Sequence, residues 1–393
     1  MKNIFLLILV VFSGRIFADI EYHGEAGIEQ RYFFEDAIYP QQQRSNLSGY
    51  FSPELYTSLN NGDDSFVFKG FIRFDQQDSE RSHLDIRELK WTHAGSDWEL
   101  QAGVGKVFWG QTESLHLVDI INQTDLVEAI DGEDKLGQPM VTVSLFKEWG
   151  NTTLYVLPYF RERTFPGTDG RFRAPLPIDT DNALYESEDK QQNLDWAARW
   201  EHSLGVWDIG LSYFDGTSRE PLFTIETNEL SESSLTPFYP LLQQVGLDLL
   251  ALVGDWTIKF EGVQRKIQDQ STTAFVGGFE YSFVQVFDSF IDINWLMEYQ
   301  FDERDLLAQS QNDLMLGSRI VFNDIDGTEV LVGIVQDLEY SSVRSGFIEA
   351  SSRINDNWKW RVDAWMFSSD EPSELTYLLR RDDYVQLSLE YYF

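Results

Sequence analysis

Residues 291–300 read Ile-Asp-Ile-Asn-Trp-Leu-Met-Glu-Tyr-Gln, and apolar or aromatic side chains occupy every second position. Successive side chains of a β-strand point to opposite faces, so this stretch has one apolar and one mostly polar face. The same alternation recurs in residues 66–75, 194–201 and 256–261. Segments of about ten residues exceed the usual strand length of soluble sheets and match what a tilted strand needs to cross a bilayer.

The connections between these segments alternate in length. Short turns are predicted at residues 60–64, 94–97, 150–151, 204–205, 254–255, 288–289, 323–327 and 355–357. Mostly longer polar loops are predicted at residues 35–45, 76–82, 109–138, 161–192, 215–240, 267–273, 302–311, 341–346 and 368–382. Short periplasmic turns on one side and long extracellular loops on the other are typical of outer-membrane barrels.

We therefore expect an all-β protein, a transmembrane antiparallel up-and-down β-barrel of about 18 strands. The alternative count is 16, because residues 84–93 and 278–287 lose clean alternation. A lipid environment offers no hydrogen-bond partners to the backbone, so the first strand, near residues 20–33, should pair with the last and leave no open edge.

The N-terminus predicts export. A basic start at Lys2 is followed by the apolar run Ile4 to Phe12, and Ala18 ends an acceptable cleavage site. This pattern is typical of a secretory signal peptide, and the run is too short to span a bilayer. We expect residues 1–18 to be a signal peptide, residues 19–393 to form the barrel, and the protein to reside in the outer membrane of a Gram-negative bacterium.

Composition excludes several classes of function. The 393 residues include 30 Lys+Arg and 65 Asp+Glu, which gives a formal net charge of −35 and argues against nucleic-acid binding. There is no cysteine, which excludes disulfides and thiolate metal sites. The five histidines lack metal-ligand spacing, so neither a metal nor a cofactor is expected.

Aromatic residues mark the ends of the predicted strands. Trp98, Trp149, Trp207, Trp256 and Trp358 lie next to short turns, where an interfacial aromatic girdle is expected. At the C-terminus Val385, Leu387, Leu389, Tyr391 and Phe393 occupy alternate positions. This ending resembles the C-terminal signature of bacterial outer-membrane barrels, which implies recognition by the barrel-assembly machinery.

The polar faces of the strands carry charges of both signs, which argues for a wet lumen. The basic candidates for the lumen wall are Lys69, Arg73, Arg199, Lys259, Arg319, Lys359 and Arg361. They are interleaved with carboxylates, Glu261 and Glu298 among them. Two interpretations remain open: opposed rows that create a transverse field for polar solutes, or cross-strand ion pairs that offset the cost of burial.

Loop 109–138 is the most informative connection. It combines seven acidic residues with one lysine, and it also holds apolar residues such as Leu115, Ile120 and Ile121 that a solvated loop would not need. We expect it to fold into the channel and narrow it; the alternative is a cap on the outer rim. The candidates for the constriction are Trp109, Glu113, Asp119, Asn122, Asp125, Glu128, Asp131, Glu133 and Asp134.

A family resemblance is carried by part of this region. Arg87-Glu88-Leu89, Gly105-Lys106 and Trp109-Gly110, followed by Asp119, Asn122 and Asp125, resemble an uncharacterised proteobacterial family of porin-like outer-membrane proteins. The resemblance covers residues 85–145 by motif and the rest by the general barrel pattern. It implies a channel without an established substrate.

The sequence thus predicts a porin-like channel for passive diffusion of small hydrophilic solutes, with mild cation preference because the outer loops are acidic. One alternative is a plugged, substrate-specific channel for amphipathic compounds. The other is an outer-membrane barrel enzyme of the lipase or protease type, which we do not expect because no Ser–His–acid set stands out and His202 adjoins a periplasmic turn. The expected partners are the lipid bilayer, lipopolysaccharide, small solutes and the assembly machinery, and the pattern is compatible with a homo-oligomer.

Overall fold

The computed structural model describes residues 20–227, 231–304 and 308–393. The predicted signal peptide, residues 1–18, lies outside the described residues. Within the described ranges the secondary structure consists of strands and short 3-10 turns. None of the helical segments in the described chain is long and apolar enough to cross a membrane.

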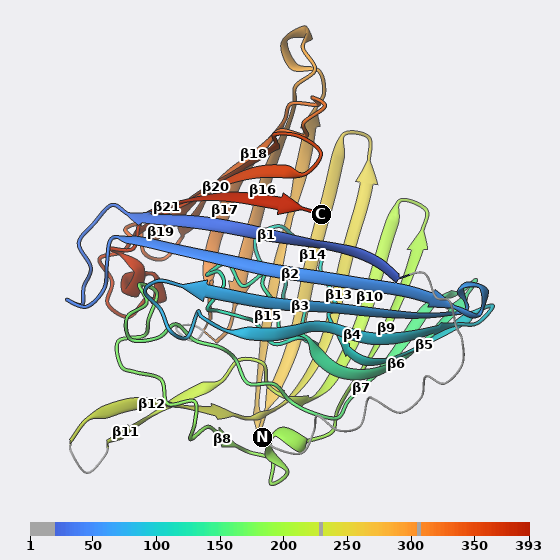
Figure 1. Cartoon of the computed structure of the whole chain (residues 1–393), viewed down its shortest axis with the longest axis horizontal. Helices are drawn as coiled ribbons and strands as arrows, with labels where there is room; N and C mark the ends of the chain where they lie inside the picture. The colour runs from blue at the N-terminus through green and yellow to red at the C-terminus, as the bar shows by residue number, and fades with distance from the viewer. Residues whose placement is uncertain (1–19, 228–230, 305–307) are drawn as a thin grey trace.

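Eighteen antiparallel strands form one closed sheet, which confirms the predicted barrel and its strand count (Figure 1). They are β1 (Ile20–Phe33), β2 (Ser45–Leu59), β3 (Asp64–Asp75), β4 (Leu84–Ala94), β5 (Trp98–Gly105), β6 (Gln138–Lys147), β7 (Gly150–Leu157), β9 (Asp195–Leu204), β10 (Trp207–Thr217), β13 (Leu241–Val253), β14 (Trp256–Ile267), β15 (Gln270–Phe283), β16 (Asp292–Asp302), β17 (Asn312–Val321), β18 (Glu329–Asp337), β19 (Arg344–Arg353), β20 (Trp358–Ser368) and β21 (Tyr384–Tyr392).

The barrel closes between its first and last strands. β1 pairs with β21 over nine residue pairs from Glu25↔Tyr392 to Phe33↔Tyr384. Each strand therefore has a neighbour on both sides, as the backbone of a lipid-exposed sheet requires.

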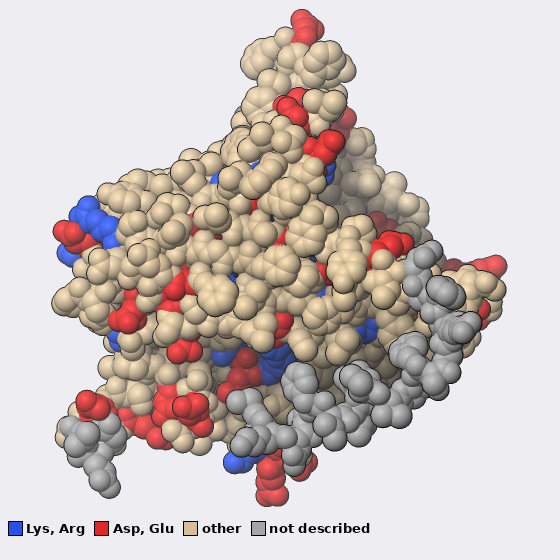
Figure 2. All heavy atoms as spheres, viewed as in Figure 1, with Lys and Arg blue, Asp and Glu red and all other residues tan. Residues whose placement is uncertain are grey.

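The alternation of side chains follows the sequence pattern. On β9, Asp195 and Arg199 are buried inside, whereas Trp196 is 44% exposed on the outer surface. Figure 2 shows a largely uncharged band over the strands, with acidic side chains gathered at the lower left, where β11 (Leu222–Thr227) and β12 (Ser233–Tyr239) lie in Figure 1. The outer face is thus apolar around its waist.

Two predicted connections have different bounds in the structure. The predicted loop 267–273 is a turn of two residues, Gln268 and Asp269, because β14 and β15 extend to Ile267 and Gln270. Gln268 adopts the left-handed conformation that such a tight turn needs (φ 53°). The predicted turn 288–289 is wider and includes a 3-10 turn at Val286–Asp288.

A small sheet at the loop end was not predicted. β11 pairs antiparallel with β12, and β12 pairs parallel with β8 (Leu184–Tyr185). These residues belong to loops predicted to be irregular, and the pairing of β8 with β12 spans more than fifty residues. A two-residue strand with a distant partner leaves no periodic signal in the sequence.

The aromatic residues divide between the outer face and the interior. The five girdle tryptophans are exposed beside short turns, and Leu387, Leu389, Tyr391 and Phe393 are exposed on the outer side of the last strand. Other aromatic side chains are buried inside the barrel, among them Phe33, Trp109, Phe160, Phe214, Tyr239, Phe347 and Tyr384. These side chains pack under the inward-folded connections.

Candidate functional site

The connection between β5 and β6, residues 106–137, lies against inward-facing side chains of several strands. Trp109, 3% exposed, packs edge to face on Tyr155 of β7 with ring centroids 5.5 Å apart. The guanidinium of Arg199 on β9 lies 5.1 Å from the Trp109 ring centroid. Val118 and Ile121 are fully buried in the same cluster. The apolar residues of this loop therefore build a packed core inside the barrel.

Two glutamates on distant strands hold the first half of this loop. Glu261 of β14 accepts hydrogen bonds from the backbone N–H groups of Gln111 (2.7 Å), Thr112 (3.1 Å) and Val118 (3.2 Å), and from the Thr112 hydroxyl (2.7 Å). Hydrogen bonds to an ionised acceptor are about twice as strong as neutral ones. Glu261 has no exposed surface, so its carboxylate interacts with the loop and not with solvent.

Glu298 of β16 holds the next residues of the loop in the same way. It accepts hydrogen bonds from the backbone N–H groups of Glu113 and Ser114, both at 2.8 Å, and from the Ser114 hydroxyl. The Glu113 carboxylate reaches Arg319 of β17 at 2.5 Å and lies 3.8 Å from Lys259 of β14. The loop thus extends from β5 and β6 to the strands β14 to β17.

Gly110 allows the loop to approach Glu261 closely. It adopts φ +151°, and a Cβ at this position would lie 2.8 Å from His116 Nδ1 and 3.0 Å from Glu261 Oε1. A side chain would therefore push the loop off its anchor. This close approach is a physical reason for glycine after Trp109.

His116 adds a positive charge between two carboxylates. Its Nε2 is 3.1 Å from Glu133 and its Nδ1 is 3.8 Å from Glu261. Burial lowers the pKa of His116, but Glu133 and Glu261 outweigh burial and raise it to about 10. The imidazolium form therefore prevails at neutral pH and helps hold the loop.

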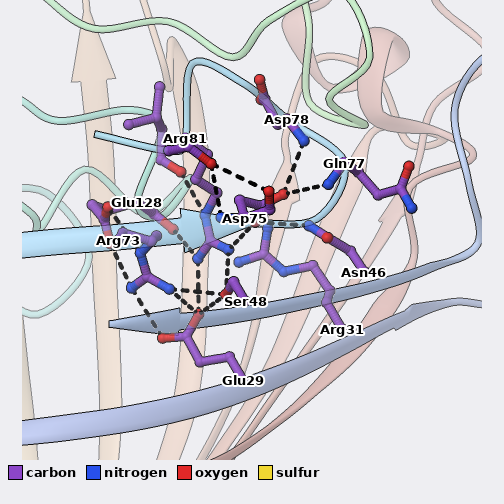
Figure 3. Close-up of polar contacts among 12 residues, drawn as sticks. Glu29, Arg31, Asn46, Ser48, Arg73, Asp75, Gln77, Asp78, Arg81 and Glu128 are labelled. Atoms are coloured by element: carbon purple, nitrogen blue, oxygen red, sulfur yellow. Dashed lines mark hydrogen bonds and ion pairs between the residues drawn. The ribbon is translucent and has the colours of Figure 1, made fainter. Parts of the chain in front are cut away.

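The second half of the loop rests on Arg73 of β3 and Arg81 of the connection between β3 and β4 (Figure 3). Arg73 pairs with Glu128 and with Glu29 of β1, each at 2.6 Å, and Arg81 pairs with Glu29 at 2.9 Å. Arg81 also donates to the backbone oxygen of Val127 at 2.9 Å. These ion pairs are buried, so the loss of one partner would leave the other charge buried without compensation.

Asp125 is part of the same buried network. Its carboxylate pairs with Arg87 at 2.6 Å and accepts a hydrogen bond from Thr164 at 2.6 Å. Burial raises its pKa, but nearby His83 and Arg87 hold it below its usual range. His83, Asp125 and Glu128 bring three ligand atoms within 4.8 Å of one another. Because arginines already neutralise both carboxylates, these residues fit an ion-pair network better than a metal site.

Asn122 and Asp119 shape the loop from within. Asn122 donates to the backbone oxygens of Gly105 (2.9 Å) and Leu136 (2.8 Å) and accepts from the N–H of Val107 (2.8 Å). Asp119 accepts from the Trp109 N–H at 3.3 Å and pairs with Lys135. Both side chains therefore fasten the two ends of the loop together and do not face a passage.

A third group of carboxylates has no cation within ion-pair distance among the described residues. Asp131 and Asp134 belong to the loop, and Glu349 of β19 and Asp363 of β20 face each other in register on the wall. The charges of Asp363, Asp131 and Glu113 act on Glu349 against that of Arg319. At Asp363 the charge of Arg361 opposes those of Glu29 and Asp131. Burial raises the pKa of Asp131 and of Asp134. An unpaired acidic stretch therefore lies between the loop and β19–β20.

The structure thus divides the residues that the sequence singled out. Of the constriction candidates, Trp109, Asp119, Asn122, Asp125 and Glu128 are buried in packing or ion pairs, while Glu113 pairs with Arg319, Glu133 with His116, and Asp131 and Asp134 remain unpaired.

Of the basic candidates, Arg73, Arg199, Lys259 and Arg319 pair with acids at short range, Lys69 is 3.9 Å from Glu54, and Arg361 is 3.5 Å from Glu390. Lys359 lies partly buried opposite Glu390 in the strand register.

Two cavities lie on either side of the loop. One of about 470 Å³ is near the short turns and is lined by Gln111 together with Arg199, Glu201 and Asp248. The other, of about 150 Å³, is at the loop end and is lined by Leu115, Ile120 and several arginines. Residues of the loop therefore line both cavities.

No family model matches the chain and no curated protein matches its sequence, so the family resemblance of residues 85–145 stays a prediction. Among solved structures the chain is similar to Wzi of Escherichia coli, an outer membrane protein described as involved in group 1 capsule assembly and as a carbohydrate-binding β-barrel. The TM-score is 0.52 at 11% identity, over 93% of this chain and 83% of that chain.

It is also similar to a loop-deletion mutant of OmpT, an outer membrane protein of Vibrio cholerae (TM-score 0.48, 10% identity, 96% of this chain and 99% of that chain). A mutant of the Rh. blastica porin gives a TM-score of 0.46 at 11% identity, over 95% of this chain and 100% of that chain. At such low identity the likeness concerns the fold alone. The chain therefore has the fold of an outer-membrane β-barrel.

Proposed function

We propose that the protein is an outer-membrane channel for passive diffusion of small hydrophilic solutes, with a preference for cations. The observation that carries this proposal is the unpaired acidic stretch of Asp131, Asp134, Glu349 and Asp363 beside the inward-folded loop. Carboxylates without a protein cation are available to a passing one, and rings or rows of Asp and Glu favour cations in channels.

In this proposal the loop narrows the lumen and does not seal it. The strongly paired half, at Glu261, Glu298, Arg73 and Arg87, anchors the loop to the wall. The acidic half leaves room for solutes between residues 130–134 and the strands β19 and β20. The apolar outer face would contact lipid and lipopolysaccharide, and recognition of the C-terminus by the assembly machinery and formation of a homo-oligomer stay predictions.

A plugged, substrate-specific channel is the second candidate. It is favoured by the full burial of Val118 and Ile121 in the loop. A barrel enzyme is not proposed, because the buried acids and bases described above serve to hold the loop.

Planar-bilayer recording of the full-length protein tests the proposal. In a KCl gradient we expect steady conductance and a reversal potential of the sign that cation preference gives. A reversal potential of the opposite sign would overturn the cation preference. Absence of conductance together with saturable binding of one compound would favour the plugged channel.

A further inference from the structure

Arginines gather around the cavity of about 150 Å³ at the loop end of the barrel. Arg163 comes from the connection after β7, Arg219 from the connection after β10, Arg265 from β14, and Arg304 from the connection after β16. They converge although the chain is strongly acidic, with 65 acidic residues against 30 basic ones. Glu349 and Asp363 are not part of the lining of this cavity, whereas Asp131 of the loop is.

Three carboxylates form ion pairs with three of these four guanidinium groups. Arg219 pairs with Asp195 at 2.8 Å, and Arg265 pairs with Asp302 at 3.0 Å. Arg304 pairs with Asp302 at 2.7 Å and also with Glu220. The arginine side of the cavity therefore carries one positive charge more than its carboxylates neutralise.

Arg163 is the guanidinium that lacks a carboxylate. Its Nε donates to Gln123 at 3.2 Å, and its terminal nitrogens have no hydrogen-bond or ion-pair partner among the described residues. Burial lowers the pKa of Arg163 and the charge of Glu220 opposes this, while the residue stays partly exposed. Arg219, 3% exposed, also has a buried Nη2 without a partner in the described part of the chain. Unsatisfied buried donors are costly, so an acceptor here would be stabilised.

The cavity wall also contains apolar side chains. Its lining includes Leu115, Leu117, Ile120, Ile130, Leu242 and Ile267. Of the acids in the lining, Asp119 pairs with Lys135, Glu133 pairs with His116, and Asp131 has no ion-pair partner among the described residues. A cavity of about 150 Å³ with apolar walls is large enough for a benzene ring.

We propose that this cavity binds a small organic monocarboxylate, with its carboxylate on Arg163 beside Arg219 and its apolar body against Leu115, Ile120 and Ile267. The planar guanidinium fork matches a carboxylate in two parallel hydrogen bonds, and the apolar wall excludes a preference for a bare inorganic anion. A single carboxylate supplies the acceptor that the terminal nitrogens of Arg163 lack among the described residues.

The test is calorimetric titration of the purified full-length barrel in detergent with benzoate. We expect saturable binding with one site per chain, while benzamide, which has nearly the same shape without the charge, and inorganic phosphate bind at least about tenfold more weakly. The substitution Arg163→Gln should weaken benzoate binding about tenfold or more, a loss of about 1.4 kcal/mol. Arg44→Gln, which removes an exposed arginine paired with Asp36 in another loop, should leave binding unchanged.

Heat-modifiable gel mobility verifies that each variant keeps its barrel, and Arg163→Lys offers a milder change that keeps the charge and loses the fork. Absence of saturable benzoate binding would overturn the proposal. So would equal binding of benzamide, equal binding of phosphate, or wild-type affinity in folded Arg163→Gln. Because binding is measured without ion flow, the result does not depend on whether the barrel conducts.

Discussion

The two sides of the lumen use the same residue types in opposite ways. At β3, β4, β14 and β16 every buried carboxylate that meets loop 106–137 is matched by arginines or by several N–H donors, and the loop is fastened there. At β19 and β20, Glu349 and Asp363 face Asp131 with no cation within ion-pair distance among the described residues. Paired charges in this barrel hold the loop to the wall, whereas in the proposed function the unpaired charges interact with solutes.

The largest expected effect comes from breaking the paired side at Arg73. Arg73→Met leaves Glu29 and Glu128 buried with less compensation, so the free energy of unfolding should fall by about 3–5 kcal/mol. Urea unfolding followed by gel mobility measures it. The matched change Lys69→Met removes a lumen-facing cation that is only 3.9 Å from a half-exposed Glu54, and should cost less than about 1 kcal/mol. Equal losses in the two variants would contradict the distinction.

The next effect concerns the anchor at Glu298. Glu298→Gln replaces an ionised acceptor of three loop hydrogen bonds by a neutral amide, which should weaken loop docking by about 1.5–3 kcal/mol. Single-channel recording should show larger and noisier conductance than wild type. Glu54→Gln, at a glutamate without a contact to the loop among those described, serves as the control. Unchanged conductance in Glu298→Gln would argue that the loop is held elsewhere.

The alternation in the sequence placed Glu261 and Glu298 on the polar face of their strands and predicted that residues 109–138 fold inward. The alternation could not predict which loop residues these two glutamates contact, because each contact joins residues 143 to 185 positions apart. The arginine cluster was missed for a related reason: Arg163, Arg219 and Arg304 lie in irregular connections, whose position depends on packing and not on periodicity. A local signal does exist, since residues 161–173 hold four arginines in an acidic chain.

A smaller effect is expected from pH, through His116. Its folded pKa of about 10 exceeds the ordinary value of 6.5, so its stabilising contribution is complete below pH 6.5 and is lost as the pH rises toward 10. Between pH 7 and 10 the wild type should lose roughly 1–2 kcal/mol more stability than His116→Gln, discounted for the exposure of Glu133. Urea midpoints at both pH values measure the difference. Identical pH profiles would contradict the role of the imidazolium.

The smallest effect belongs to the unpaired side. Glu349→Gln with Asp363→Asn should leave stability near wild type and reduce the cation-to-anion permeability ratio about fivefold per charge at most, since a charge about 8 Å away stabilises a cation and destabilises an anion by roughly 0.5 kcal/mol each in water. Reversal potentials in a KCl gradient measure the ratio. Asp179→Asn, in an outer loop, should change it less. A ratio unaffected by the double substitution would place the conducting path elsewhere.

The most direct test uses the absence of cysteine from the chain. A single cysteine is introduced at Glu349 or at Val118, which is fully buried, and each channel is exposed to a positively charged thiol reagent during bilayer recording. If the unpaired acidic side is the passage, Glu349→Cys should lose current and cation preference on reaction, while Val118→Cys should not react. Block at Val118→Cys with no change at Glu349→Cys would contradict the division of the lumen.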